Sequence, residues 1–371
     1  MSCERGGRDG CIMFRPAQAG LNIERSRGKT VAHPVHKPIK VSAEARELHK
    51  KSLVVDLHTD SFMAVRLLRL DYARRNEPPD GMQPWKLHTD VPRLREGGVD
   101  AVFYGIVTHP IPLGAYGRAL RNIHFARREF EKTGVSFCTS PDQILAARER
   151  GAVAGLLGLE GFHMLEGRVE RLADLYRLGV RYAGMTHFTS NAFAVSSASK
   201  LRKHGRLNAR GYEALEACES LGMMVDLAHV HTDIINEVCI RATKPVIVSH
   251  GATYAVRPIF RNLTDRDIRS VASTGGVIGL FYKAEWIAPE GQPATLATVV
   301  DHADHIKRLV GARHIALGSD WDGLIATPAG MRGAEDLPAL TQIYLQRGYS
   351  PEEVTGILGG NFMRAFKDAT D

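Results

Sequence analysis

Residues 52–62, SLVVDLHTDSF, join an apolar run to side chains that can hold a metal ion. The apolar, β-branched run 53–55 is typical of a buried strand. In a strand, residues i and i+2 point to the same side, so His58 and Asp60 would present a nitrogen and an oxygen to one point. A divalent cation is a natural occupant of that point.

Further histidines and carboxylates follow other short apolar runs. Taken alone, a histidine after a strand is more often a hydrogen-bonded loop residue than a ligand, and a carboxylate is more often an ion-pair partner. The series is harder to explain by unrelated structural needs, because it recurs at six expected strand ends. Its members are His58 and Asp60, Glu160 and His163, His187, His229, His250, and Asp320 and Asp322.

The donor types narrow the chemistry. Imidazole and carboxylate without thiolate suit Zn²⁺, Mn²⁺ or Fe²⁺ in a catalytic site. Three histidines and two carboxylates exceed what one ion needs if it keeps an open position. They suit two ions about 3.5–4 Å apart, bridged by a carboxylate and a hydroxide, which is hydrolytic chemistry.

The candidate ligands can share a metal site only if the fold brings the ends of their strands together. Eight apolar runs alternate with helix-like segments, which predicts an α/β fold, a (β/α)₈ TIM barrel with its functional residues at the carboxyl ends of the strands. A doubly wound open sheet is the alternative, but no G-x-G-x-x-G follows any of the runs. The predicted strands are Leu53–Leu57, Val99–Val107, Val153–Leu159, Arg181–Thr186, Met223–Leu227, Pro245–Ser249, Gly276–Phe281 and His314–Gly318.

Capping signals place helices between these strands. The amphipathic segment 119–134 predicts a helix that ends at a glycine. The segment 140–151 opens with Ser-Pro, and Gln143 is expected to close a capping box with the serine. The segment 350–366 opens in the same way, with Glu353 at the third helical position.

The basic excess points to a separate N-terminal segment. The 371 residues carry a formal net charge of +7, and much of the excess lies in the first forty residues. We expect residues 1–45 to form a basic, poorly ordered extension and residues 46–371 to form one catalytic barrel domain. A nucleic-acid-binding arm is disfavoured because no aromatic residues are interleaved with the basic ones.

The sequence also predicts a cytoplasmic protein. We find no secretory h-region and no apolar run of about 18 residues, so no membrane association is expected. The five cysteines are scattered, without C-x-x-C spacing. This pattern favours reduced thiols over a disulfide frame or a thiolate zinc site.

Eight short motifs identify a family. The chain from about Ser52 to Phe366 resembles the membrane (renal) dipeptidases, the zinc peptidases of family M19, which have a TIM-barrel fold. The motifs are D-x-H-x-D at 56–60, D-x-P-R-x-x-x-G-G at 90–98, G-x-E-G at 158–161, D-L-x-H-V at 226–230, S-H at 249–250, R-N-L-x-D at 261–265, G-S-D-x-D-G at 318–323 and G-G-N at 359–361.

The resemblance implies a dinuclear site with two Zn²⁺ per chain. His58 and Asp60 would bind one ion, and His229 and His250 would bind the second. Glu160 would bridge the two.

The resemblance also implies residues that act on the substrate. His187 would contact the substrate and stabilise the tetrahedral oxyanion. Arg261 would pair with the C-terminal carboxylate, which suits a guanidinium fork. Asp320 would bind the substrate amine and carry the proton of the attacking water.

Other positions are expected to be structural or to alter specificity. Leu57 and Thr59 replace the Gly and Asn usual in the family, and His231 replaces a serine. The segment 188–197 also departs from the family pattern, which affects the pocket more than the metal ligands. We expect a supporting structural role for three further residues, Asp322, Asp90 and Asn361. For Asp322, an interpretation as part of a tight Asp-Gly turn fits the sequence equally well. The role of His163 is open.

The predicted activity is that of a metallo-dipeptidase, which hydrolyses dipeptides through attack of a hydroxide that bridges two zinc ions. The expected substrates include dipeptides with a C-terminal D-residue. The substrate is a small molecule, and the resemblance implies a homodimer. One alternative is another metal-dependent amidohydrolase, acting on an N-acyl amino acid or a lactam. A second is an inactive metal-binding scaffold, which the presence of His187, Arg261 and Asp320 argues against.

Overall fold

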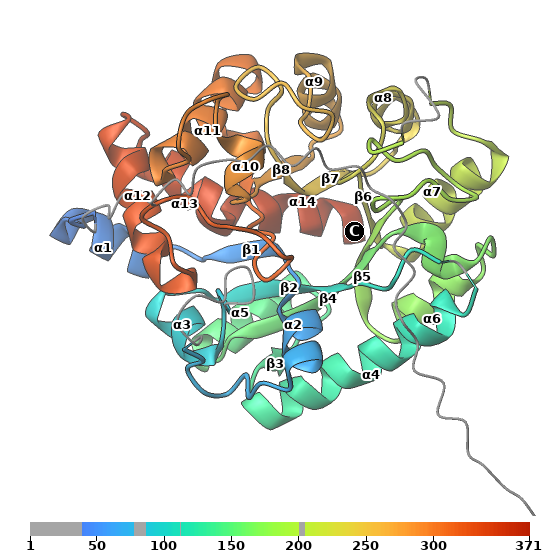
Figure 1. Ribbon diagram of the computed structural model, residues 1–371, viewed down its shortest axis with the longest axis horizontal. Helices are drawn as coiled ribbons and strands as arrows, with labels where there is room; N and C mark the ends of the chain where they lie inside the picture. Colours follow the sequence, from blue (N-terminus) through green and yellow to red (C-terminus); the bar gives the residue numbers. More distant parts are fainter. Residues whose placement is uncertain (1–38, 78–86, 112, 200–204) are drawn as a thin grey trace, which may run out of the picture. The chain divides into compact units, whose positions relative to one another are not determined.

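Eight parallel strands close into a barrel in the computed structural model, which describes residues 39–77, 87–111, 113–199 and 205–371 (Figure 1). The ring runs β1-β2-β4-β5-β6-β7-β8-β9 and closes through β1 and β9. The predicted TIM barrel is therefore confirmed. The strands are β1 Val55–Thr59, β2 Ala101–Ile106, β4 Ala154–Glu160, β5 Val180–Gly184, β6 Met224–Asp226, β7 Ile247–Gly251, β8 Val277–Leu280 and β9 Ile315–Leu317.

Each predicted strand overlaps one of these eight. The short strand β3, Ser136–Phe137, was not predicted, because two residues show no periodicity. It pairs with Ala154 and Gly155 at the start of β4, whereas β5 pairs with β4 from Leu157 onward. β3 is thus an addition at the barrel's edge and not a member of the ring.

Helices alternate with the strands and surround the barrel (Figure 1). In the described residues they are α1 Ala43–Lys51, α2 Ser61–Leu68, α3 Val91–Glu96, α4 Ala115–Thr133, α5 Pro141–Glu149, α6 Arg171–Arg177, α7 Ala209–Leu221, α8 Thr232–Arg241, α9 Asp265–Ser273, α10 Ala284–Ile287, α11 Leu296–Val310, α12 Leu337–Gln346, α13 Pro351–Thr355 and α14 Asn361–Thr370, with the 3-10 turns η1 Phe162–Leu165, η2 Ala312–His314 and η3 Ala334–Asp336 and the π-turn η4 Gly356–Gly360.

The capping predictions hold at two helices and fail in part at a third. α4 ends at Gly134, whose φ of 72° suits a residue without Cβ. Ser350 and Glu353 form a capping box at α13. At α5 the Ser140 hydroxyl accepts from the amide of Gln143, but the Gln143 side chain accepts from the amide of Thr139 at 2.7 Å. The expected box is therefore displaced by one residue.

The C-terminal helix α14 covers the end of the barrel where the strands begin. Phe362 and Phe366 pack with Phe103 of β2, at ring-centroid distances of 5.4 and 6.1 Å. They join one buried cluster with apolar residues at the starts of the strands, such as Val55 and Ile247. This apolar plug leaves the opposite end, where the strands finish, for polar residues.

The predicted N-terminal extension lies largely outside the described residues. Residues 1–38 belong to the part that is not described, and the first described helix, α1, begins at Ala43. Among the helices that the structure describes, none combines the length and apolar character needed to cross a bilayer.

Candidate metal centre

The predicted site residues converge at the carboxyl ends of the strands. His58 and His250 lie within the last residues of β1 and β7, and Glu160 is the last residue of β4. His187 and His229 each follow the end of a strand, β5 and β6, by three residues. Asp60 directly follows β1, and Asp320 follows the end of β9 by three residues. Barrel closure therefore brings six separate strand ends to one place.

One half of the site contains His58, Asp60 and Glu160, all buried. The Nε2 atom of His58 lies 3.4 Å from Oδ1 of Asp60 and 3.7 Å from Oε2 of Glu160. None of these three atoms has a hydrogen-bond partner in the described part of the chain. Buried polar atoms are normally paired, so three facing one point require an explanation.

The other half surrounds the second oxygen of Glu160. Oε1 of Glu160 lies 3.3 Å from Nε2 of His229, 3.6 Å from Nε2 of His250 and 3.6 Å from Nε2 of His187. The Nε2 atoms of His229 and His250 are 2.9 Å apart. Glu160 therefore stands between two sets of donors, with one oxygen toward each.

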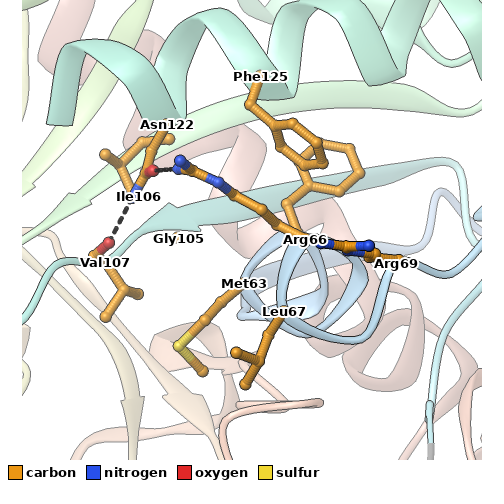
Figure 2. Close-up of a pocket in the computed structure, with 10 residues that line it drawn as sticks. Met63, Arg66, Leu67, Arg69, Gly105, Ile106, Val107, Asn122 and Phe125 are labelled. Atoms are coloured by element: carbon orange, nitrogen blue, oxygen red, sulfur yellow. Dashed lines mark hydrogen bonds between the residues drawn. The ribbon is translucent and has the colours of Figure 1, made fainter. Parts of the chain in front are cut away.

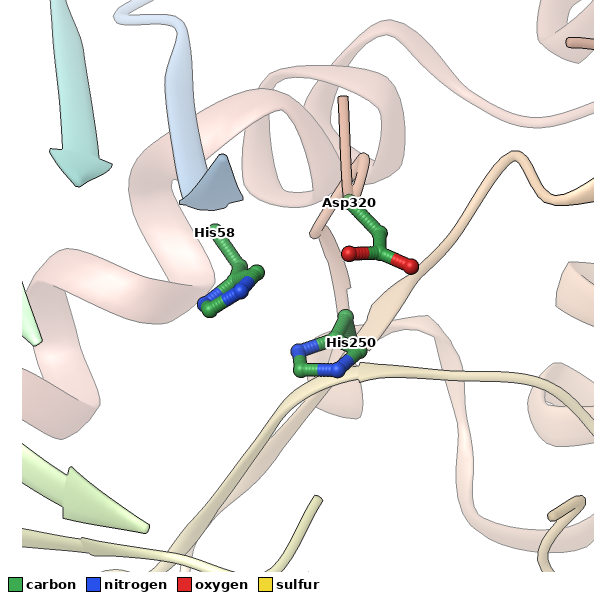
Figure 3. Close-up of side chains that lie close together, drawn as sticks. All are labelled: His58, His250 and Asp320. Carbon is green, nitrogen blue, oxygen red and sulfur yellow. The ribbon is translucent and has the colours of Figure 1, made fainter. Parts of the chain in front are cut away.

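His58 and His250 also lie together with Asp320 (Figure 3). Their rings stack with centroids 4.2 Å apart, and the donor atoms of the three residues fall within 4.8 Å of one another. The two halves are thus adjacent, and Asp320 borders both. His187 falls into a ligand-like group with Glu160 and His229, which the sequence did not predict for it.

The electrostatics of the site favour positive charge. Burial raises the pKa of Glu160 well above its usual range, and Asp60 adds to this effect. Burial alone would lower the pKa of His58, but the carboxylates of Glu160, Asp60 and Asp320 outweigh burial and raise it to about 10. Several buried carboxylates without an adequate counter-charge are expensive.

The other histidines are held in the neutral form, which is the form that binds metals. Burial lowers the pKa of His187 to about 3, with a further contribution from His163. Burial also lowers the pKa of His229 and His250 well below the usual value, and nearby cationic groups act in the same direction. Their Nε2 lone pairs are therefore available to a cation.

Tyr182 holds His58 in place, a contact that the sequence did not reveal. Its hydroxyl lies 2.7 Å from Nδ1 of His58, on the ring side opposite Asp60. The Tyr182 ring packs over Gly158, where a Cβ would come within 2.0 Å of the ring. Glycine at 158 is thus needed for the tyrosine that orients the histidine.

His250 has a different support. The Ser249 hydroxyl lies 2.9 Å from Nδ1 of His250 and donates to Oδ2 of Asp226 at 2.7 Å. Asp226 also accepts the amides of Ala228 and Ser249. The motifs D-L-x-H-V and S-H contained this information, because the aspartate and serine are the residues that link β6 to β7.

Arg261 and Asp320 lie at the edge of the donor set. The Arg261 guanidinium is buried and donates to the carbonyl of His250 at 2.8 Å, while its Nε has no partner among the described residues. Burial lowers its pKa to about 10, so it stays charged at neutral pH. Burial and then Asp60 raise the pKa of Asp320 to about 7.

Two of these positions have a left-handed backbone. His229 has φ 63° and Asp320 has φ 60°. This region is sparsely populated by residues other than glycine, and such conformations gather at functional sites.

The residues predicted to be structural do lie outside the donor set. Asp322 accepts from Ser61 Oγ at 2.5 Å and from the His88 amide at 2.6 Å, so it anchors a buried network and does more than form a turn. Asp90 caps α3 and pairs with Arg93, and Asn361 donates to two carbonyls before and at the start of β9. His163 contacts Thr108 through Nε2 at 3.0 Å.

A cavity of about 510 Å³ lies beside the site, between α2 and α4 (Figure 2). Asn122 accepts from the Arg66 guanidinium and donates to the Val107 carbonyl across it. Gly105 links the cavity to the site, because a Cβ there would fall 2.6 Å from Oδ1 of Asp60. None of the predicted site residues is among the described residues that line this cavity.

The donor set fits a divalent metal centre. It consists of imidazole nitrogens and carboxylate oxygens, several of which are buried with no partner in the described residues. The described cysteines, Cys138, Cys218 and Cys239, are buried and free and take no part in it. Such a set is typical of catalytic metal sites.

Comparison with known proteins agrees with this geometry. The family model for membrane dipeptidase (peptidase family M19) matches residues 42–371. A dipeptidase, aclJ, from Aspergillus oryzae is 30% identical over 295 residues, which cover 75% of this chain and 69% of that protein.

Solved structures share the fold. The probable dipeptidase PvdM from Pseudomonas aeruginosa superposes with a TM-score of 0.77 at 19% identity, over 88% of this chain and 98% of that one. A metallopeptidase from Rhodobacter sphaeroides gives 0.77 at 22% identity, over 86% of this chain and 100% of that one. The chain therefore belongs to the membrane dipeptidase family, peptidase family M19, and is a metal-dependent dipeptidase.

Proposed function

We propose that the chain is a dinuclear zinc dipeptidase. The observation that carries this proposal is the position of Glu160. Its two oxygens face two separate groups of unpaired or closely spaced donors, one with His58 and Asp60 and one with His229 and His250. A single ion would leave one group unsatisfied.

The residues that would hold the metal are His58 and Asp60 on one side and His229 and His250 on the other, with Glu160 between them. When bound, two zinc ions there would lower the pKa of a water molecule and polarise the scissile carbonyl. Zinc is favoured over Mg²⁺ by the imidazole donors.

Arg261 would bind the carboxylate of the substrate. Its guanidinium is buried at the wall of the site, keeps its charge and has unused donor capacity. A guanidinium fork matches a carboxylate in geometry as well as in charge. This fixes the C-terminal end of a dipeptide relative to the metal ligands.

Asp320 and His187 would act on the reacting atoms. Asp320 has a pKa near neutrality, so it can take a proton from the attacking water and pass it to the leaving amine. His187 is neutral, half-buried and 3.6 Å from Glu160. From there its ring can donate to the carbonyl oxygen as negative charge develops.

A C-terminal D-residue is part of the proposal. The metallopeptidase from Rhodobacter sphaeroides was solved with a phosphinate mimic of the dipeptide L-Ala-D-Ala. If Arg261 holds the carboxylate, inversion at the C-terminal Cα moves the side chain and leaves both the carboxylate and the scissile carbonyl in reach.

We retain two further expectations as proposals. The free thiols of Cys138, Cys218 and Cys239 suit a cytoplasmic location. A homodimer is implied by the family and is testable by light scattering.

The first experiment is metal analysis by mass spectrometry on the purified protein, together with amino-acid release from matched L,L and L,D dipeptides. We expect about two zinc per chain and turnover of both forms. Two zinc without turnover of any dipeptide would favour the alternative, an amidohydrolase for N-acyl amino acids or lactams, which should then be assayed. Failure to bind metal when zinc is supplied would refute the site.

A further inference from the structure

We propose that an arc of aromatic side chains forms the subsite for the side chain of the substrate's C-terminal residue, and that this residue is apolar or aromatic. Phe188, Trp286 and Phe260 form the accessible face of the arc, and the fully buried Phe281 packs against Trp286. The inference rests on the proposed function, because it takes the position of the substrate from Arg261 and His187. It adds a substrate class to the activity.

The arc begins at the metal centre. The Phe188 ring lies 4.4 Å from the His187 ring and 5.0 Å from the His229 ring, measured between centroids. Trp286 follows at 6.3 Å from Phe188, in an edge-on arrangement. Phe188 therefore touches the histidine proposed to meet the scissile carbonyl.

The arc ends at the proposed carboxylate anchor. Phe281 lies 6.0 Å from Trp286, and the Arg261 guanidinium is 5.6 Å from the centre of the Phe281 ring. A dipeptide whose carboxylate reaches Arg261 and whose carbonyl reaches His187 must place its C-terminal Cα between these two residues. The side chain on that Cα is then beside the aromatic arc.

The arc presents apolar surface to solvent that a substrate could cover. Phe188 is 47% exposed, and Phe260, whose ring is 6.1 Å from Trp286, is 57% exposed. Burying such surface is favourable because it removes apolar area from water. An apolar substrate side chain would gain this energy, whereas glycine would not.

The three accessible rings of the arc come from segments that follow barrel strands. Phe188 lies in the loop after β5, Phe260 in the loop after β7, and Trp286 in α10 after β8. Loops at the carboxyl ends of barrel strands usually set specificity. Phe188 also falls in the segment 188–197, where the sequence departs from the family pattern.

Lys283 presents the competing possibility. Its ammonium lies 4.8 Å from the Trp286 ring and 4.0 Å from the carboxylate of Glu285. A free lysine would favour an acidic side chain, but this one already has an aromatic face and a carboxylate. We therefore assign the arc to an apolar side chain.

The test measures kcat/KM of the zinc-loaded protein for Ala-Gly, Ala-Ala, Ala-Leu, Ala-Phe and Ala-Glu, and for the reversed Leu-Ala and Phe-Ala. We expect Ala-Leu and Ala-Phe to exceed Ala-Gly by about tenfold or more. Phe188→Ala should lower the ratio of Ala-Leu to Ala-Gly by about tenfold, and Phe188→Leu should lower it less. Because Phe188 is half-exposed, its truncation should not prevent folding.

Ile240→Ala is the matched control, because Ile240 is 78% exposed on α8 and should leave both the ratio and the zinc content unchanged. Four outcomes would each overturn the inference while leaving the dipeptidase proposal standing. They are equal turnover of all C-terminal residues, a preference for Ala-Glu, a preference expressed only in the reversed dipeptides, and a ratio of Ala-Leu to Ala-Gly that Phe188→Ala leaves unchanged. Failure to cleave any dipeptide would overturn both.

Discussion

The buried histidines at the carboxyl ends of the strands differ from those in the helix layer in how their ring nitrogens are paired. His49 of α1 is bonded at both nitrogens, to Thr341 and to the carbonyl of Gly97, each at 2.8 Å. His302 of α11 is bonded to Thr253 and to the carbonyl of Ile287. Both rings are fully used by the fold.

Three of the four metal-centre histidines are used only in part, whereas both ring nitrogens of His250 have partners. His58 bonds Tyr182 through Nδ1, whereas its Nε2 has no partner among the described residues. The Nδ1 atoms of His187 and His229 are likewise without partners in the part of the chain that the structure describes. Burial alone therefore does not distinguish a ligand from a structural histidine, whereas incomplete pairing of the ring nitrogens separates most of the metal-centre histidines from His49 and His302.

The largest effect should come from Asp320→Asn. Asparagine keeps the size of the side chain but cannot carry the proton, so kcat should fall by about 10²–10⁴. Zinc content and melting temperature should stay near those of the wild type. Turnover close to wild type would show that Asp320 is not the proton carrier. It would also weaken the comparison between residues that serve the reaction at this end of the barrel and residues that serve the fold.

Replacing one histidine from each group with alanine should have opposite effects on stability and on zinc content. His302→Ala leaves the Thr253 amide and Ile287 carbonyl unpaired in the core, so unfolding free energy should fall by about 2–4 kcal/mol with zinc content unchanged. His58→Ala should lose zinc and cost less in the metal-free protein. Urea unfolding with and without chelator, beside mass spectrometry, measures both.

If His58→Ala kept full zinc content, His58 would leave the proposed ligand set. If it destabilised the metal-free protein more than His302→Ala does, the distinction between the two groups of histidines would fail.

Acid should lower the free energy of unfolding because the structural histidine His302 is buried in its neutral form. Burial lowers the pKa of His302 from 6.5 to about 4, so the unfolded state binds this proton more readily than the folded state. The contribution of neutral His302 to the free energy of unfolding is complete above pH 6.5 and is lost as pH falls toward 4. The loss is about 3 kcal/mol in total, at about 1.4 kcal/mol per pH unit.

This acid sensitivity is measurable by urea unfolding at pH 7 and pH 4 in wild type and His302→Gln. The wild type should lose about 3 kcal/mol more than the variant over this interval. An equal loss in the two proteins would mean that protonation of His302 does not oppose folding.

The smallest expected effects are at the residues that orient the ligands. Tyr182→Phe removes the bond to His58, and Ser249→Ala removes the bond to His250. Each should weaken zinc binding by about 10–100-fold in chelator competition. Tyr344→Phe is the matched control, because the Tyr344 hydroxyl is buried without a partner among the described residues. Equal affinities in all three variants would remove Tyr182 and Ser249 as positioning residues.

The fold was predictable because its signals are local. Apolar runs of strand length marked all eight barrel strands, and the serine, proline and glycine signals marked α4, α5 and α13. The errors were also local. The two-residue strand β3 is too short for a pattern, and the Gln143 side chain bonds the amide of Thr139 in place of that of Ser140, which is a choice between neighbouring donors.

Apart from the motif residues Asp226 and Ser249, the supports of the candidate site were not predictable in the same way. Tyr182 and His58 are 124 residues apart in sequence, and Asp322 meets Ser61 across 261 residues. No local spacing relates such pairs. Each appears, taken by itself, as an ordinary strand or turn residue.

The sequence by itself determined the alternation of strands and helices, the donor types and the strand ends at which they stand, because these depend on short-range preference and side-chain chemistry. Only the tertiary structure decided how the ring nitrogens of each histidine are paired, that Glu160 faces both halves of the site, and that Phe188 packs against Trp286. Those features arise when the barrel closes, since closure brings residues from distant strands within bonding distance of one another.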